Sequence, residues 1–324
     1  MAEESPYAIL RNGVKVPMLG LGKSHFSFVT VNDFKSFKGT THSGGYIHDT
    51  VVYALKDCGY RHLDTAKRYG VEKYLAQAVN DSRIDRSDIF LSTKLWPTDY
   101  GQDKTAKAAQ NAMERLKTDY LDLYMMHFPT CPSNVNNPNQ VLIDTWRQLE
   151  LLLDREQIRA IGVSNFDIED LEILMESKET CMDPLVNQCE FHPYNHPKSL
   201  LRFCQDAQIQ FEGYCPLAKG KILNEPPVVR VAEKLQKSPA QVLIKWSIRH
   251  DVLTIPKSTK KHRVLENFQA LDFEIPDQEM NLLDNLNQQM RIIDLSDLQL
   301  RLDQDLPDGY KMKKFPCILP DFIA

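Results

Sequence analysis

Short hydrophobic runs alternate with longer stretches in which apolar residues recur every three or four positions, starting near residue 49. The short runs predict buried strands, and the longer stretches predict amphipathic helices. The predicted strands span 19–21, 60–64, 89–93, 121–126, 158–163, 185–188, 209–214 and 252–256. The predicted helices span 51–56, 69–79, 103–116, 167–176, 197–207 and 226–249, the last broken at Pro239, and one more helix runs from the loop at 129–139 to residue 155.

Eight strands that alternate strictly with helices indicate a parallel sheet with right-handed crossovers, and eight such units close into a barrel. We therefore predict an α/β fold, a (β/α)8 TIM barrel. No Gly/Ser tract, Pro tract or block of like charge divides the 324 residues, so we expect a single domain over residues 1–324. Ahead of the barrel, residues 8–10 and 14–16 flank Asn12 and Gly13, a pair that favours a β-hairpin. Residues 23–49 show no sustained period and predict a long loop.

Composition excludes several classes of protein. The net charge is −5 with no basic stripe, so we expect neither nucleic acid nor an anionic membrane as a partner. The seven cysteines are scattered, without a C-x-x-C pair or metal-type spacing, so we expect reduced thiols and no metal. The N-terminus has no signal-peptide profile, and no apolar run approaches the ~20 residues of a membrane span. These features predict a cytoplasmic protein.

Polar side chains with complementary chemistry stand at the carboxyl ends of the predicted strands. Asp64 ends one strand, and Tyr69 follows a turn later. Lys94 and His127 end the next two strands. A free tyrosine has a pKa of about 10, so its phenol needs a nearby cation to exchange protons near neutral pH. Parallel strands point their carboxyl ends at one face, so acid, base, cation and amides converge there. The later strands end at Ser164, Asn165, Gln188, Tyr214, Lys257 and Ser258.

Three blocks of sequence resemble the aldo-keto reductase family. They are Gly59–Ala66 with Tyr69 and Glu72, Ile161–Phe166, and Ile255–Ser258 with Arg263 and Asn267. The resemblance covers nearly the whole chain. It implies a (β/α)8 barrel that binds a nicotinamide cofactor without a Rossmann domain, and no G-x-G-x-x-G follows a strand here.

The resemblance places the family's four catalytic residues at Asp64, Tyr69, Lys94 and His127. Lys94 would stabilise the phenolate of Tyr69 and lower its pKa, and Asp64 would hold the ammonium in place. Tyr69 would protonate a carbonyl oxygen, which His127 would orient. The expected activity is reduction of aldehydes and ketones to alcohols.

The cofactor contacts that the resemblance implies lie on the later strands and loops. Lys257, Ser258 and Arg263 would suit the 2′-phosphate of NADP(H), although a solvated basic loop has the same composition. The wider set of expected cofactor contacts is Ser164, Asn165, Gln188, Tyr214, Leu217, Lys257, Ser258, Arg263 and Asn267.

The expected substrate is a small carbonyl compound, with Trp96 and Phe128 as candidate pocket residues. The resemblance also implies a monomer with a C-terminal tail, residues 290–324, that folds over the barrel mouth. Departures from the family pattern include Lys23 after the first strand, a longer first loop, and Glu266 near the expected adenine site.

Two alternatives stay open at this point. An NADP(H)-binding protein that senses redox state, or a structural crystallin-like protein, would carry the same fold with little turnover. A sugar-phosphate isomerase on this barrel is weaker, because it would not need Lys257 and Arg263 together with the amides of Asn165 and Gln188.

Overall fold

The computed structural model describes residues 6–22, 48–293, 295–296 and 298–303. Most of the predicted loop at 23–49, including Lys23, and the tail beyond residue 303 lie outside these described residues. The strands are β1 (Tyr7–Ile9), β2 (Lys15–Pro17), β3 (Leu21–Gly22), β4 (His62–Asp64), β5 (Phe90–Leu95), β6 (Leu123–Met126), β7 (Ile161–Ser164), β8 (Val186–Glu190), β9 (Gln210–Tyr214) and β10 (Leu253–Thr254). The helices are α1 (His48–Lys56), α2 (Glu72–Ser82), α3 (Gln102–Leu116), α4 (Pro138–Asp154), α5 (Ile168–Met175), α6 (Lys198–Asp206), α7 (Pro226–Leu235), α8 (Pro239–Arg249), α9 (Lys261–Phe268), α10 (Asp277–Asp284) and α11 (Leu298–Asp303).

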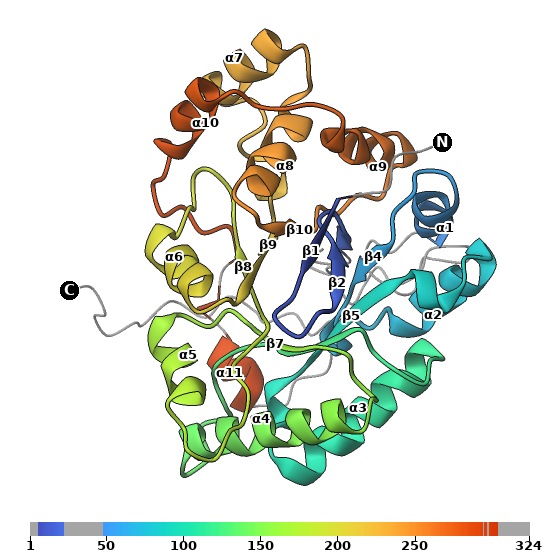
Figure 1. The fold of residues 1–324 in the computed structure, drawn as a ribbon, viewed down its shortest axis with the longest axis vertical. Coiled ribbons are helices and arrows are strands. Elements are labelled where there is room, and N and C mark those ends of the chain that lie inside the picture. Colours follow the sequence, from blue (N-terminus) through green and yellow to red (C-terminus); the bar gives the residue numbers. More distant parts are fainter. Residues whose placement is uncertain (1–5, 23–47, 294, 297, 304–324) are drawn as a thin grey trace.

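Strands β3 to β10 form one parallel sheet in chain order, surrounded by helices (Figure 1). The sheet closes on itself through a parallel bridge between Leu19 and Thr254 and a hydrogen bond of 3.1 Å from the Gly22 N–H to the Pro256 carbonyl. Glycine is needed at this seam, because a Cβ on residue 22 would lie 2.6 Å from the Ile255 carbonyl oxygen. The structure confirms the predicted eight-stranded barrel.

The N-terminal hairpin is confirmed as an antiparallel pair of β1 and β2. Its apolar residues Leu10 and Val16 pack with the first residues of three barrel strands, Phe90, Leu123 and Val186. The hairpin therefore covers the amino ends of the strands. The carboxyl ends, where the candidate site residues stand, lie at the opposite end of the barrel.

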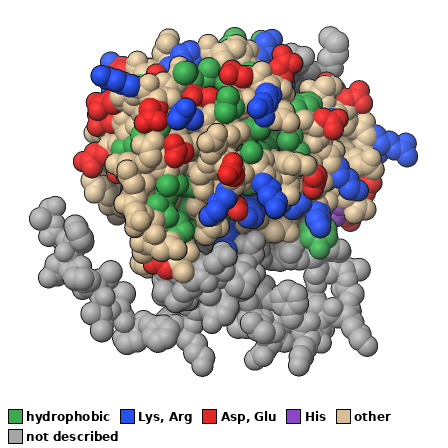
Figure 2. Space-filling model, turned by 90° about the horizontal axis from the view of Figure 1, so that it is seen from below, with side chains coloured by type: hydrophobic (Ala, Val, Ile, Leu, Met, Phe, Trp, Pro, Cys, Tyr) green, Lys and Arg blue, Asp and Glu red, His purple; other side chains and the backbone are tan. Residues whose placement is uncertain are grey.

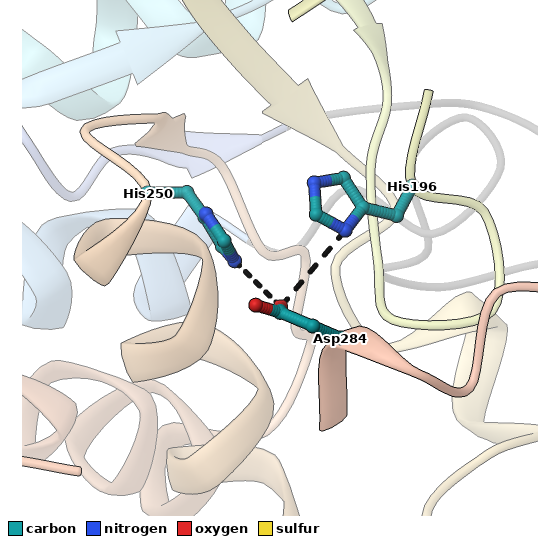
Figure 3. Close-up of side chains that lie close together, drawn as sticks. All are labelled: His196, His250 and Asp284. Carbon is teal, nitrogen blue, oxygen red and sulfur yellow. Dashed lines mark hydrogen bonds and ion pairs between the residues drawn. The ribbon is translucent and has the colours of Figure 1, made fainter. Parts of the chain in front are cut away.

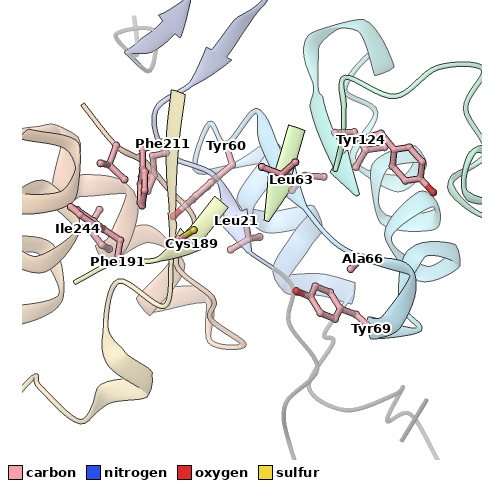
Figure 4. Close-up of a cluster of buried hydrophobic side chains, with 14 of the residues drawn as sticks. Leu21, Tyr60, Leu63, Ala66, Tyr69, Tyr124, Cys189, Phe191, Phe211 and Ile244 are labelled. Carbon is pink, nitrogen blue, oxygen red and sulfur yellow. The ribbon is translucent and has the colours of Figure 1, made fainter. Parts of the chain in front are cut away.

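The larger core lies between the barrel strands and the helices around them. Figure 4 shows part of it, with side chains from β3, β4, β6, β9 and α8 together and Tyr69 at its edge beside Ala66. Buried tryptophans fill the layer between strands and helices, and the Trp246 ring stacks on Phe191 with centroids 4.8 Å apart. This packing fixes the strands, and hence the residues at their ends.

The elements differ from the prediction in several places. Tyr69 ends a 3-10 turn over Lys67–Tyr69 and does not begin a helix, because Gly70 follows with φ of 65° and α2 starts only at Glu72. Helix α9 (Lys261–Phe268) was not among the predicted helices. Helix α10 was not predicted. The break at Pro239 is confirmed, since α7 ends at Leu235 and α8 starts at Pro239.

Charged side chains of both signs are mixed over the face shown in Figure 2. Among the described residues, no helix has the length and apolar character needed to cross a membrane.

Candidate active site

A cavity of about 720 Å³ opens at the carboxyl ends of the barrel strands. Thirteen of the fifteen residues predicted from the sequence as catalytic, cofactor-binding or substrate-binding line it: Asp64, Tyr69, His127, Phe128, Ser164, Asn165, Gln188, Tyr214, Leu217, Lys257, Ser258, Arg263 and Asn267. The other two, Lys94 and Trp96, lie directly behind this lining. Lys94 contacts Asp64, and Trp96 packs against His127 and Phe128.

Asp64 and Lys94 form a buried ion pair at the ends of β4 and β5. The Lys94 ammonium donates to Asp64 Oδ2 at 2.6 Å and to the Thr65 carbonyl at 3.0 Å. The same carboxylate oxygen accepts from the Ser92 hydroxyl and from the Gln188 amide, both at 3.0 Å. Because every partner is buried, this carboxylate holds the cation in a fixed position.

Tyr69 lies next to this pair with its ring centroid 5.5 Å from the Lys94 ammonium. The pKa of its phenol is raised well above 10, because burial penalises the phenolate and the Asp64 charge adds to the penalty. Contrary to the expectation, the net pKa of this phenol is not lowered, because burial and the Asp64 charge outweigh the stabilisation that Lys94 could give the phenolate. The Lys94 ammonium donates its hydrogen bonds to Asp64 and Thr65. Tyr69 is a protonated hydrogen-bond donor at neutral pH.

His127 follows β6 and faces the same end of the cavity. Burial, together with the positive charges of Lys94 and Arg68, lowers the pKa of its imidazole well below 6.5. The ring is therefore neutral. It packs edge-on against Tyr69 with centroids 5.8 Å apart and stacks on Phe128 at 4.8 Å. A neutral imidazole beside a phenol can donate a hydrogen bond to a substrate oxygen without carrying charge.

A connected set of amide and hydroxyl groups lines the adjacent wall. The Tyr214 hydroxyl donates to Asn165 Oδ1 at 2.7 Å, and the Asn165 amide donates to the His127 carbonyl and to Ser164 Oγ at 2.9 and 3.1 Å. Asn165 adopts a φ of 63°, a left-handed conformation that asparagine tolerates better than most residues. This strained residue therefore links the ends of β6, β7 and β9.

Gln188 lines the cavity, but its amide nitrogen is already engaged. It donates to Asp64 Oδ2 at 3.0 Å and to Glu212 Oε2 at 2.7 Å. Glu212 lies fully buried in β9, and its other oxygen is 3.3 Å from His62 Nε2. The sequence prediction missed Glu212 and His62. The available signal was a carboxylate in the middle of an otherwise buried strand, which is unusual without a partner.

Cationic groups also line the cavity. Lys257, Ser258 and Arg263 all line it, together with Glu266. Partial burial lowers the pKa of the Lys257 ammonium. Two cations and a hydroxyl that line one cavity fit a phosphate group, whereas Glu266 adds an opposing charge to the same lining.

The tail approaches the mouth of the barrel within its described part. Leu302 of α11 packs in a cluster with Trp96 and Phe128. Ile293 lines the cavity, and its N–H and that of the preceding residue donate to the buried Glu190 carboxylate at 2.9 and 2.6 Å. Within the described residues, the tail therefore contributes Ile293 to the cavity lining and Leu302 to the apolar cluster with Trp96 and Phe128.

Comparisons with known proteins agree with this geometry. The model of the Aldo/keto reductase family matches residues 36–288. An uncharacterized oxidoreductase of Caenorhabditis elegans is 46% identical over 308 residues, which cover 95% of this chain and 89% of that protein. The glyoxal reductase of Bacillus subtilis is 38% identical over 283 residues, covering 87% and 93%. The crystal structure of a Bombyx mori aldo-keto reductase in complex with NADP superposes with a TM-score of 0.80 at 28% identity, covering 95% and 99%.

Proposed function

Because the chain belongs to the aldo/keto reductase family of oxidoreductases, we propose that it reduces aldehydes and ketones to alcohols with NADPH. One observation carries the proposal. A protonated Tyr69, a neutral His127 and the Asp64–Lys94 ion pair lie together at a cavity whose lining also includes the cations Lys257 and Arg263. The two groups that face a carbonyl oxygen are hydrogen-bond donors, as reduction requires.

The residues at the site fit an NADP(H) molecule. Ser164 and Asn165 present a hydroxyl and an amide beside the catalytic end, and Tyr214 offers a ring in the cavity wall. Lys257, Ser258 and Arg263 would hold the 2′-phosphate. Leu217 and Asn267 also line the cavity. The side-chain nitrogen of Gln188 donates to Asp64 and Glu212, so its side-chain oxygen is left to accept a hydrogen bond from the cofactor. When bound, the cofactor supplies the hydride.

Tyr69 acts as the general acid in the proposed reaction. Its hydroxyl proton passes to the carbonyl oxygen as negative charge develops there, and a phenol with a raised pKa stays protonated at neutral pH until that moment. Lys94 offsets the negative charge that the transfer leaves on the phenolate, and Asp64 keeps the ammonium in place. His127 donates a hydrogen bond that orients the oxygen.

The substrate class we propose is small and aromatic aldehydes and dicarbonyls. Trp96, Phe128 and Leu302 form an apolar wall beside His127 that would contact the rest of the substrate. The similarity to a glyoxal reductase supports small dicarbonyls. We further propose a monomer that works in the cytoplasm, where the six described cysteines, all free, would stay reduced.

The test is NADPH oxidation by the purified protein across a panel that includes methylglyoxal, nitrobenzaldehyde, sugars and steroids, run beside Tyr69→Phe. We expect wild-type turnover and a loss of about 10²- to 10⁴-fold in kcat for the variant, with NADPH binding retained. Tyr7→Phe is the matched control, because Tyr7 is exposed on the hairpin at the opposite end of the barrel. If neither wild type nor variant turns over any carbonyl while both bind NADPH, the protein is a sensor or a structural protein and the proposal fails.

A further inference from the structure

His196, His250 and Asp284 meet on the outer side of the barrel, away from the cavity (Figure 3). His196 precedes α6, His250 follows the last residue of α8, and Asp284 is the last residue of α10. One potential ligand atom from each residue lies within 4.8 Å of the other two. Three segments far apart in sequence therefore present two imidazoles and a carboxylate to one point.

The hydrogen bonds of this cluster leave one buried atom without a partner. Asp284 Oδ1 accepts from His250 Nε2 and from Trp246 Nε1, both at 2.8 Å. His196 Nδ1 points at the same oxygen from 3.9 Å, which is too far for a hydrogen bond. That nitrogen is buried and has no partner among the described residues, and His196 as a whole is only 5% exposed. An unpaired buried polar atom is destabilising, so something is expected to occupy the space beside it.

The spacing of these atoms suits a small cation. Zinc binds histidine nitrogen and carboxylate oxygen at about 2.0–2.2 Å in a tetrahedral arrangement, which separates neighbouring ligand atoms by roughly 3.4 Å. The two distances to Asp284 Oδ1 are 2.8 and 3.9 Å, and the three ligand atoms all lie within 4.8 Å of one another. Binding one ion would require side-chain rotations and would move the His250 proton from Nε2 to Nδ1, so that Nε2 gives up its hydrogen bond to Asp284 and ligates the ion.

Surrounding groups hold the three side chains in place. The His196 backbone exchanges two hydrogen bonds with the Asn287 side chain, at 3.2 and 2.9 Å. The Trp246 N–H fixes the orientation of the Asp284 carboxylate, and the Trp246 ring packs edge-on against His196 with centroids 5.1 Å apart. Outer groups that orient ligands in this way are typical of metal sites.

We propose that His196, His250 and Asp284 form a zinc site that joins the start of α6 to the ends of α8 and α10, with water as the fourth ligand. Two imidazoles and one carboxylate are a donor set that zinc accepts. The site lies outside the catalytic cavity, so its role is to brace the helix layer behind β8 and β9. It does not depend on the proposed reductase activity. The competing explanation is a water molecule that bridges His196 Nδ1 and Asp284.

The experiment measures zinc bound to the chelator-treated full-length protein and the accompanying shift in Tm. The background carries Cys181→Ser, which removes an exposed thiol that would bind zinc adventitiously. We expect one zinc ion per chain, a raised Tm, and a cobalt(II) absorption spectrum typical of tetrahedral nitrogen and oxygen ligands. His196→Ala should weaken binding at least tenfold, and it leaves the His250–Asp284–Trp246 hydrogen bonds in place, so the fold should persist.

Two further variants make the result decisive. Asp284→Asn keeps an oxygen that can accept the two N–H groups but removes the charge, so it should also lose zinc at least tenfold. His262→Ala, on the exposed surface of α9, should bind zinc as the background protein does. The proposal is overturned if the background protein takes up no zinc at micromolar concentration, which favours the bridging water. Equal zinc binding by the background protein, His196→Ala and Asp284→Asn would overturn it as well.

Discussion

Replacing Glu212 by glutamine should make the protein more resistant to unfolding at pH 8 and leave its stability near pH 5 almost unchanged. Glu212 is fully buried in the barrel, and burial together with the nearby Asp64 charge raises its pKa from 4.5 to about 8. Burial lowers the pKa of His62 to about 4. The two side chains are therefore both neutral at pH 7. The Glu212 carboxyl can then donate to His62 Nε2, 3.3 Å from its Oε1, while His62 Nδ1–H donates to the Pro17 carbonyl at 3.2 Å.

The magnitude follows from the linkage between protonation and folding. A carboxyl whose pKa is higher in the folded state takes up a proton on folding. Its stabilising contribution is complete below pH 4.5 and is lost as the pH rises toward 8. The loss is about 1.4 kcal/mol per pH unit, with an upper limit of roughly 5 kcal/mol over this window. Glutamine stays neutral at every pH and can make the same two hydrogen bonds, donating to His62 and accepting from Gln188. The variant should escape the loss.

Urea unfolding of wild type and Glu212→Gln at about pH 5.5, 6.5, 7.5 and 8.5 measures the effect as the difference between the two unfolding free energies. The difference should grow by about 1.4 kcal/mol per unit up to about pH 7.5 and then level off. Glu233→Gln, at an exposed position of α7, is the control and should give a curve parallel to wild type. A constant difference between wild type and Glu212→Gln would refute the reasoning, as would a wild type that is the more stable protein at pH 8. The second result would mean that Glu212 is ionised and paired with a charged His62.

Three further changes test other parts of the structure. Arg263→Ala should raise KM for NADPH by about ten- to a hundredfold and leave KM for NADH nearly unchanged, because a charge-assisted hydrogen bond contributes about 1.5–3 kcal/mol; steady-state kinetics with both cofactors measures this. Glu190→Gln should speed hydrogen exchange of the amides at 292–293 about tenfold, since their shared carboxylate loses its charge; equal protection in both proteins would contradict the role. Gly22→Ala should lower stability by about 1–3 kcal/mol in thermal or urea unfolding, because its Cβ would lie 2.6 Å from the Ile255 carbonyl oxygen.

The barrel could be predicted from the sequence because each strand is a short apolar run separated from the next by an amphipathic helix. The break at Pro239 was also predictable, since proline ends a helix unless it lies in the first turn. The turn at Lys67–Tyr69 was not. The turn depends on the left-handed backbone of Gly70, which delays the start of α2. This local geometry has no counterpart in the spacing of apolar residues along the sequence. The sequence therefore predicted the wrong element for Tyr69, although it placed the residue correctly in the segment that follows strand β4.

The location of the candidate site could be predicted for a topological reason. Residues that end neighbouring parallel strands must meet at one edge of the sheet. Asp64, Asn165 and Lys257 therefore line the same cavity, and this follows from the topology without knowledge of their side-chain orientations. The directions of the side chains could not be predicted. Tertiary packing turns the Gln188 amide nitrogen inward to Asp64 and brings His196 close to Asp284, and no spacing in the sequence records either contact.

The polar interior of the barrel accounts for the protonation states at the site. Asp64 Oδ2 accepts from Lys94, Ser92 and Gln188, so the buried carboxylate has both a cation and two neutral donors beside it, and the ion pair has no net charge. A further buried charge would lack such partners, and its desolvation would cost several kcal/mol. The pKa values of Tyr69 and Glu212 are accordingly raised, and that of His127 is lowered, so that all three groups are neutral at pH 7. Burial therefore makes the phenol proton of Tyr69 harder to remove than that of a free tyrosine, and the Lys94 ammonium lies beside the ring on which the phenolate charge would form.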